Sequence, residues 1–151
     1  MIAMRISRQT MFMEMAKIVS KRSTCFRLNV GCVLVKNNRV VSCGYNGTPP
    51  GEPHCRGNRC PGRDGCNLTI HAEDNAIRYL SVGMPDDAYI TDSPCIRCAE
   101  LLKATGIKRV FFETPYRNTD PLHWLKGNHV DVFQVTPSGY CIDWFTKEIM
   151  E

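Results

Sequence analysis

Two short segments constrain how this chain can fold. Residues 71–73 read His-Ala-Glu, and residues 94–98 read Pro-Cys-Ile-Arg-Cys. One imidazole and two thiols are side chains that bind zinc, and three protein ligands leave the fourth position of the ion open, as in catalytic zinc sites. Cys95 and Cys98 are three residues apart, so on a helix both sulfurs lie on one face. A fold that uses these groups together must bring two separate segments to one point.

The pattern of apolar residues predicts an α/β chain. Its 151 residues suit one compact domain, taken as residues 1–151. The Asn37-Asn38 pair separates two apolar runs and predicts a hairpin turn. The order β-β-α-β-α-β predicts an α/β sandwich with a mixed sheet, in which two neighbouring helix starts can meet at one zinc. We predict strands at residues 30–35, 40–45, 88–91, 108–113 and 130–135, and helices at residues 10–20, 69–80, 95–105 and 122–125.

Composition favours an intracellular metal-binding chain. Hydrophobic residues make up 43% and charged residues 23%, as in ordinary globular proteins. The net charge of +4 comes without a dense Lys/Arg run, so no nucleic-acid partner is expected. No stretch is apolar enough for a signal peptide or a membrane span, so we expect a cytoplasmic protein (in the host cytoplasm if it is viral) with no membrane partner. Nine cysteines, an odd number without an export signal, favour metal binding over disulfides.

Glu73, two residues after His71, indicates that the zinc site is catalytic. A zinc ion lowers the pKa of its bound water towards about 7. Glu73 is expected to accept the water proton, pass it to a ring nitrogen and later protonate leaving ammonia, without binding the metal. H-x-E followed by P-C-x-x-C is the signature of zinc-dependent base deaminases, in which hydroxide attacks C4 of cytosine. A structural zinc knuckle is the alternative, but the proline, the predicted helix start and the paired H-x-E favour the catalytic site.

Several further segments carry a family resemblance. Residues 44–47 read Gly-Tyr-Asn-Gly, residues 70–77 read Ile-His-Ala-Glu-Asp-Asn-Ala-Ile, and residues 94–99 read Pro-Cys-Ile-Arg-Cys-Ala. Over roughly residues 8–135 the chain resembles the deoxycytidylate (dCMP) deaminases of the cytidine deaminase superfamily. The resemblance implies a three-layer sandwich with a mixed five-stranded sheet and helices on both faces. It also implies zinc-dependent hydrolysis of dCMP to dUMP and ammonia, which supplies dUMP for thymidylate synthesis, by a homohexamer.

The resemblance also implies substrate contacts. Asn46 is similar to the asparagine that holds the sugar and the base edge, and the Ala72 backbone N–H would bind the pyrimidine O2. Arg27 and Tyr116 lie where some relatives contact the 5′-phosphate, which suits the bidentate fork of an arginine. Simpler interpretations are a turn residue for Asn46, a solvated surface charge for Arg27 and a packed aromatic ring for Tyr116.

Regulation is implied as well, because many relatives are activated by dCTP with Mg²⁺ and inhibited by dTTP. Their regulatory nucleotide binds near the Gly-Tyr-Asn-Gly loop, here Gly44, Tyr45 and Gly47. Gly47 and the prolines that follow give a rigid wall with small side chains that a nucleotide can approach closely.

A second zinc is predicted in the loop at residues 46–67, which has almost no large apolar residues. A loop of this length needs something to fix it inside a compact domain. We predict a structural zinc held by four cysteines, with His54 as the alternative to one of them; free reduced thiols are the other possibility. Such a site contributes on the order of 10 kcal/mol to folding. The four cysteines are Cys25, Cys55, Cys60 and Cys66.

Two other functions remain open at this point. A deaminase of tRNA adenosine or of single-stranded cytosine would need a basic stripe and exposed aromatic residues to hold a strand. A zinc-stapled nucleic-acid binding module would not need Glu73, and its affinity would fall steeply with salt. The nucleotide enzyme is favoured because neither a basic stripe nor interleaved aromatics are evident.

Overall fold

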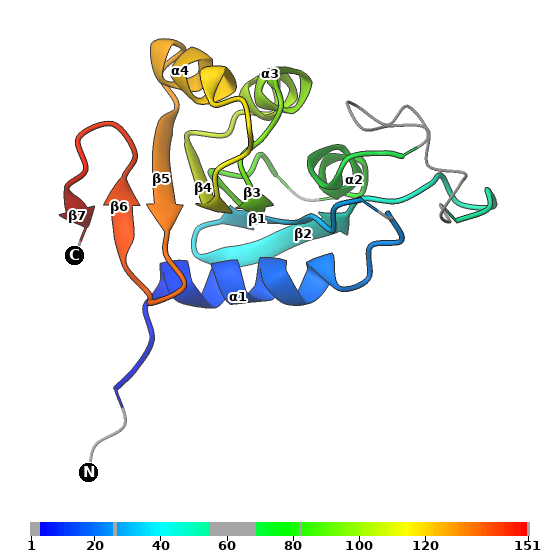
Figure 1. Ribbon diagram of the computed structural model, residues 1–151, viewed down its shortest axis with the longest axis horizontal. Helices are drawn as coiled ribbons and strands as arrows, with labels where there is room; N and C mark the ends of the chain where they lie inside the picture. The colour runs from blue at the N-terminus through cyan, green and yellow to red at the C-terminus, as the bar shows by residue number, and fades with distance from the viewer. Residues whose placement is uncertain (1–3, 26, 55–68, 82, 151) are drawn as a thin grey trace.

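In the part of the chain that the structure describes, one mixed sheet of seven strands forms the centre of the fold (Figure 1). The computed structural model describes residues 4–25, 27–54, 69–81 and 83–150. The strand order is β2-β1-β3-β4-β5-β6-β7, with β3, β4 and β5 parallel and the other pairs antiparallel. The strands are β1 (Gly31–Lys36), β2 (Arg39–Tyr45), β3 (Asp87–Asp92), β4 (Arg109–Thr114), β5 (Asp131–Val135), β6 (Cys141–Asp143) and β7 (Ile149–Met150).

Within these described ranges, four helices cover the two faces of the sheet and complete three layers (Figure 1). Helix α1 (Arg8–Ser20) lies on one face. Helices α2 (Ala72–Arg78), α3 (Ile96–Ala104) and α4 (Asp120–Gly127) lie on the other. Ser7 caps α1 by accepting a hydrogen bond from the Thr10 N–H at 3.0 Å. The predicted three-layer α/β sandwich with helices on both faces is confirmed. Within the described ranges, no helix is long and apolar enough to cross a membrane.

The residues of the parallel strands alternate between two cores. Tyr89, Phe111 and Phe133 are cross-strand neighbours on β3, β4 and β5, and they stack beneath α1. The ring centroids of Tyr89 and Phe111 are 4.3 Å apart, and those of Phe111 and Phe133 are 5.0 Å apart. Intervening residues such as Ile90 and Phe112 point to the opposite core, under α2, α3 and α4. Because side chains alternate along a strand, this pattern fixes the register of the sheet.

Two glycines let helices approach the sheet closely. A Cβ at Gly31 would collide with the backbone carbonyl of Ala16 on α1. A Cβ at Gly44 would lie 2.5 Å from the backbone nitrogen of Ala76 on α2. Both positions therefore require glycine for packing. The hairpin turn between β1 and β2 is also confirmed, since Asn37 and Asn38 have φ values of 49° and 61°, as two-residue hairpin turns require.

The expectation of five strands is wrong, because two short strands follow β5. Strands β6 and β7 have three and two residues and extend the sheet beyond the last predicted strand. Elements this short carry too few residues for a periodic signal. Helix α2 also begins later than predicted, because Ile70 pairs with Gly47 in an isolated bridge and keeps the chain extended up to His71.

Candidate active site

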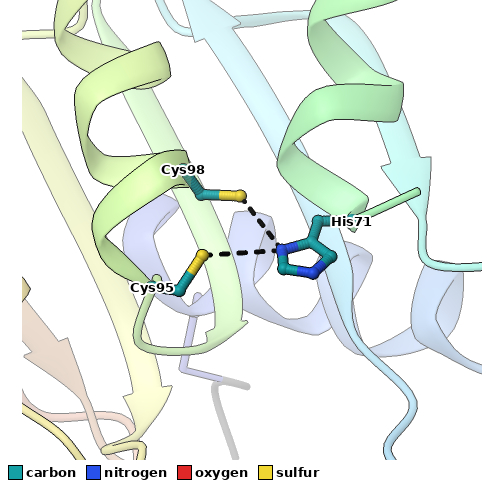
Figure 2. Close-up of side chains that lie close together, drawn as sticks. All are labelled: His71, Cys95 and Cys98. Carbon is teal, nitrogen blue, oxygen red and sulfur yellow. Dashed lines mark hydrogen bonds between the residues drawn. The ribbon is translucent and has the colours of Figure 1, made fainter. Parts of the chain in front are cut away.

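The histidine and the two cysteines of the sequence motif meet at two helix starts (Figure 2). His71 is the N-cap residue of α2, and Cys95 is the N-cap residue of α3. The His71 Nδ1 atom lies 3.3 Å from the Cys98 Sγ and 3.5 Å from the Cys95 Sγ. Among the described residues, these three form the only group of His, Cys, Asp or Glu side chains close enough to share a metal ion.

This donor set fits a zinc ion. The three ligand atoms all lie within 4.8 Å of one another. Ligand atoms bound to one tetrahedral zinc stand roughly 3.5 Å apart, given the usual Zn–N and Zn–S bond lengths. The observed separations from His71 to the two sulfurs match that spacing. The prediction that His71, Cys95 and Cys98 converge is therefore confirmed by the geometry.

The local electrostatics favour a thiolate at Cys95. A hydrogen bond from Cys98 lowers the pKa of the Cys95 thiol to about 4, and the hydrogen bond with His71 acts in the same direction. The pKa of Cys98 is raised because it shares its proton with Cys95 and is buried. The pKa of His71 is raised by its hydrogen bond with Cys95. A helix N-terminus stabilises a thiolate further, and the thiolate is the form that binds metal.

Glu73 lies in the first turn of α2, with its side chain against the metal-ligand group. It is only 4% exposed, and burial raises the pKa of its carboxyl to about 7. A carboxyl that titrates near neutral pH can both accept and return a proton under physiological conditions. Glu73 lies outside the group whose ligand atoms cluster around His71. Its position thus suits a proton carrier beside the metal.

A cavity of about 290 Å³ opens next to these residues. All four positions at which the family resemblance implies substrate contact line this cavity, although their roles remain predictions. They are Arg27, Asn46, Ala72 and Tyr116. Cys25, predicted as a structural zinc ligand, is buried and also lines the cavity. The other three cysteines of that prediction, Cys55, Cys60 and Cys66, lie outside the described residues.

Asn46 holds one wall of the cavity in place. Its Oδ1 accepts hydrogen bonds from the Ser23 hydroxyl at 2.6 Å and the Val30 N–H at 2.9 Å. Its Nδ2 donates to the Leu28 carbonyl at 2.7 Å. Both lone pairs of the amide oxygen are thus used, and one N–H has no acceptor among the residues that the structure describes. Asn46 can therefore meet a ligand only as a donor, and it also fixes the segment that carries Arg27.

Sequence reasoning missed four polar residues of the cavity: Thr69, Asp92, Ser93 and Arg117. Burial raises the pKa of the Asp92 carboxyl. Asp92 and Ser93 stand where β3 ends, and ligands bind outside the carboxyl ends of parallel strands. Their position directly before Pro94 and Cys95 was the signal that could have identified them. Arg117 lies with its guanidinium carbon 5.5 Å from the centroid of the neighbouring Tyr116 ring.

A second cavity, of about 530 Å³, lies along the end of β2 and the segment that follows it. Gly44, Tyr45 and Gly47, the residues implied in regulation, all line it. Gly44 has its own structural reason, the close packing of α2, so its identity alone does not indicate a nucleotide site. The other polar side chains around this cavity include those of Arg22, Glu52, His54 and Asn75.

The fold and this site together define a class of zinc-binding deaminase domains, and comparison with known proteins agrees. Residues 6–114 match the family described as the cytidine and deoxycytidylate deaminase zinc-binding region. The chain belongs to this family. The resemblance drawn from the sequence motifs is thereby confirmed.

Individual relatives extend the comparison. Over 125 residues the chain is 41% identical to a deoxycytidylate deaminase of Schizosaccharomyces pombe, covering 74% of this chain and 38% of that protein. Over 118 residues it is 41% identical to ComE operon protein 2 of Bacillus subtilis, covering 75% of this chain and 62% of that protein. The chain thus spans less than two thirds of the length of either relative.

A solved structure covers more of the chain. The dCMP deaminase of cyanophage S-TIM5, in complex with dCMP and dUMP, superposes with a TM-score of 0.76 at 32% identity. The match covers 87% of this chain and 99% of the cyanophage chain.

Proposed function

We propose that this protein hydrolyses dCMP to dUMP and ammonia. The observation that carries the proposal is the position of the buried Glu73 beside the group formed by His71, Cys95 and Cys98. These residues adjoin a cavity whose lining includes an arginine and an asparagine, side chains that can bind the phosphate and the polar groups of a nucleotide. Relatives named deoxycytidylate deaminase, and the cyanophage enzyme with dCMP and dUMP bound, support this choice of substrate.

His71, Cys95 and Cys98 would hold the zinc ion, which when bound supplies a Lewis acid that makes water nucleophilic near neutral pH. Glu73 accepts a proton from the attacking water and delivers it to the ring nitrogen beside C4. It then takes the second proton of the water from the new C4 hydroxyl and gives it to the amino group as the C4–N bond breaks. Water supplies the oxygen of the product uracil ring, and ammonia carries away the nitrogen.

The remaining cavity residues would orient the nucleotide. The Ala72 backbone N–H would donate to the pyrimidine O2, and the second amide N–H of Asn46 would donate to an oxygen of the sugar or base. Arg27 and Tyr116 would meet the 5′-phosphate, since an arginine fork matches phosphate oxygens. Binding at both ends holds C4 near the reacting water.

Ammonia release from the zinc-loaded protein tests this function. The substrates offered are dCMP, CMP, deoxycytidine, dCTP and a short cytosine-containing single strand, and we expect dCMP to be preferred. Glu73→Gln should lower kcat by about 100- to 10,000-fold and leave bound zinc unchanged, because it removes only the proton carrier. Glu100→Gln, an exposed change on α3, is the matched control and should be fully active.

The outcomes separate the alternatives. Activity on the strand without activity on dCMP would instead establish a nucleic-acid deaminase. An active Glu73→Gln variant would show that another group moves the proton.

Regulation and assembly belong to the same proposal. The second cavity is proposed to bind the regulatory nucleotides, dCTP with Mg²⁺ as activator and dTTP as inhibitor, in a homohexamer. Adding each effector to the dCMP assay, with mass measurement by light scattering, tests both points. If neither dCTP nor dTTP changes the rate of dCMP turnover, the proposed regulation is wrong. If the protein is a monomer at the assay concentration, the proposed homohexamer is wrong.

A further inference from the structure

Ser93 connects the two loops that follow the parallel strands β3 and β4. It is 5% exposed and lines the cavity beside the metal-ligand group. Its hydroxyl accepts a hydrogen bond from the Tyr116 N–H at 2.6 Å, and its own N–H donates to the Thr114 carbonyl at 3.0 Å. Ser93 therefore makes hydrogen bonds both to the last residue of β4 and to the backbone N–H of Tyr116 in the loop that follows.

The loop after β4 depends on this contact for its direction. Strand β4 ends at Thr114, and Pro115 has no N–H to donate. The Tyr116 N–H is thus the first backbone donor beyond the strand, and Ser93 receives it. Fixing that group sets where the Tyr116 ring stands over the cavity.

The metal ligands do not depend on the same hydrogen bond. Cys95 is held as the N-cap of α3, where its carbonyl accepts the Ala99 N–H at 2.9 Å. Cys98 lies within the helix itself. Loss of the Ser93 hydroxyl would consequently loosen the loop of Tyr116 and leave the zinc-binding end of the cavity in place.

We propose that Ser93 is a positioning residue that sets affinity for the 5′-phosphate by holding Tyr116, and through it Arg117, against the cavity. This inference rests on the proposed dCMP deaminase function. According to this inference Ser93 affects only the binding of the 5′-phosphate, although it lies two residues before the metal ligand Cys95.

The test compares Ser93→Ala with the wild type in zinc content, in kcat and KM for dCMP, and in the inhibition constants of dUMP and deoxyuridine. Losing one hydrogen bond should raise the KM for dCMP and the inhibition constant of dUMP by about three- to tenfold. The kcat, the zinc content and the inhibition constant of deoxyuridine, which has no phosphate, should change less than about twofold. Ser42→Ala is the matched control, because its hydroxyl makes a 2.6 Å bond to the Ala76 carbonyl away from the catalytic cavity.

Equal weakening of dUMP and deoxyuridine would overturn the proposal, because Ser93 would then serve the base or general stability. Unchanged constants for both would overturn it too. A wild type that does not deaminate dCMP would instead refute the proposed function, so the two failures are distinguishable.

Discussion

Asn46 serves the fold and the site at once. Three of its four hydrogen-bonding positions are used to hold the chain at Ser23, Leu28 and Val30. This is the segment that brings Arg27 to the cavity. The sequence suggested either a ligand contact or a turn residue for Asn46, and the structure shows a brace that leaves one donor for a ligand.

Asn46→Ala should therefore lower both stability and substrate affinity. It leaves the Val30 N–H and the Leu28 carbonyl without their partner, which costs about 1–3 kcal/mol of unfolding free energy. The KM for dCMP should rise as the Arg27 segment loosens. Urea denaturation and steady-state kinetics measure the two effects. Asn128→Ala is the control, since it removes one 2.8 Å bond to the Trp124 carbonyl far from the cavity and should leave KM unchanged.

At the scale of elements, helices α1 and α2 pack closely on the sheet because the strands carry glycine at the points of contact. Gly31→Ala would press a methyl group into the backbone of α1 at Ala16 and Ser20. We expect a loss of about 1–3 kcal/mol in unfolding free energy, because neither backbone segment can move aside cheaply. Gly127→Ala, at the end of α4 with nothing within 4 Å, should be neutral or slightly stabilising. Equal costs for the two variants in chemical denaturation would contradict this packing account.

The longer elements were predictable from their apolar residues. Strands β1, β3, β4 and β5 are short continuous apolar runs buried on both faces, and α1 and α3 carry apolar residues at helical spacing. The convergence of His71 with the cysteines was predictable from ligand chemistry. The contacts of Ser93 and Asn46 were not, because each joins its partner through the folded arrangement of several segments. The short strands β6 and β7 were missed for want of length.

At the scale of the whole molecule, the two predicted metal sites determine the expected zinc content of the chain. We expect two per chain, one at His71, Cys95 and Cys98 and one at the predicted four-cysteine site that includes Cys25. Metal analysis of purified protein should then find about one zinc in Cys98→Ala and about one in Cys25→Ser, with a larger loss of thermal stability in the latter. If the wild type contains one zinc per chain and Cys25→Ser retains all of it, the prediction of a structural zinc site is wrong.

The walls of the catalytic cavity come from segments spread between Cys25 and Arg117. Bringing such distant segments together is slow, because chain entropy must be lost before these contacts form. Catalytic activity is consequently a reporter of completed folding: in a refolding experiment helical circular dichroism should return before turnover does. A chain interrupted during synthesis before residue 117 would lack part of the cavity, whatever secondary structure it had already formed.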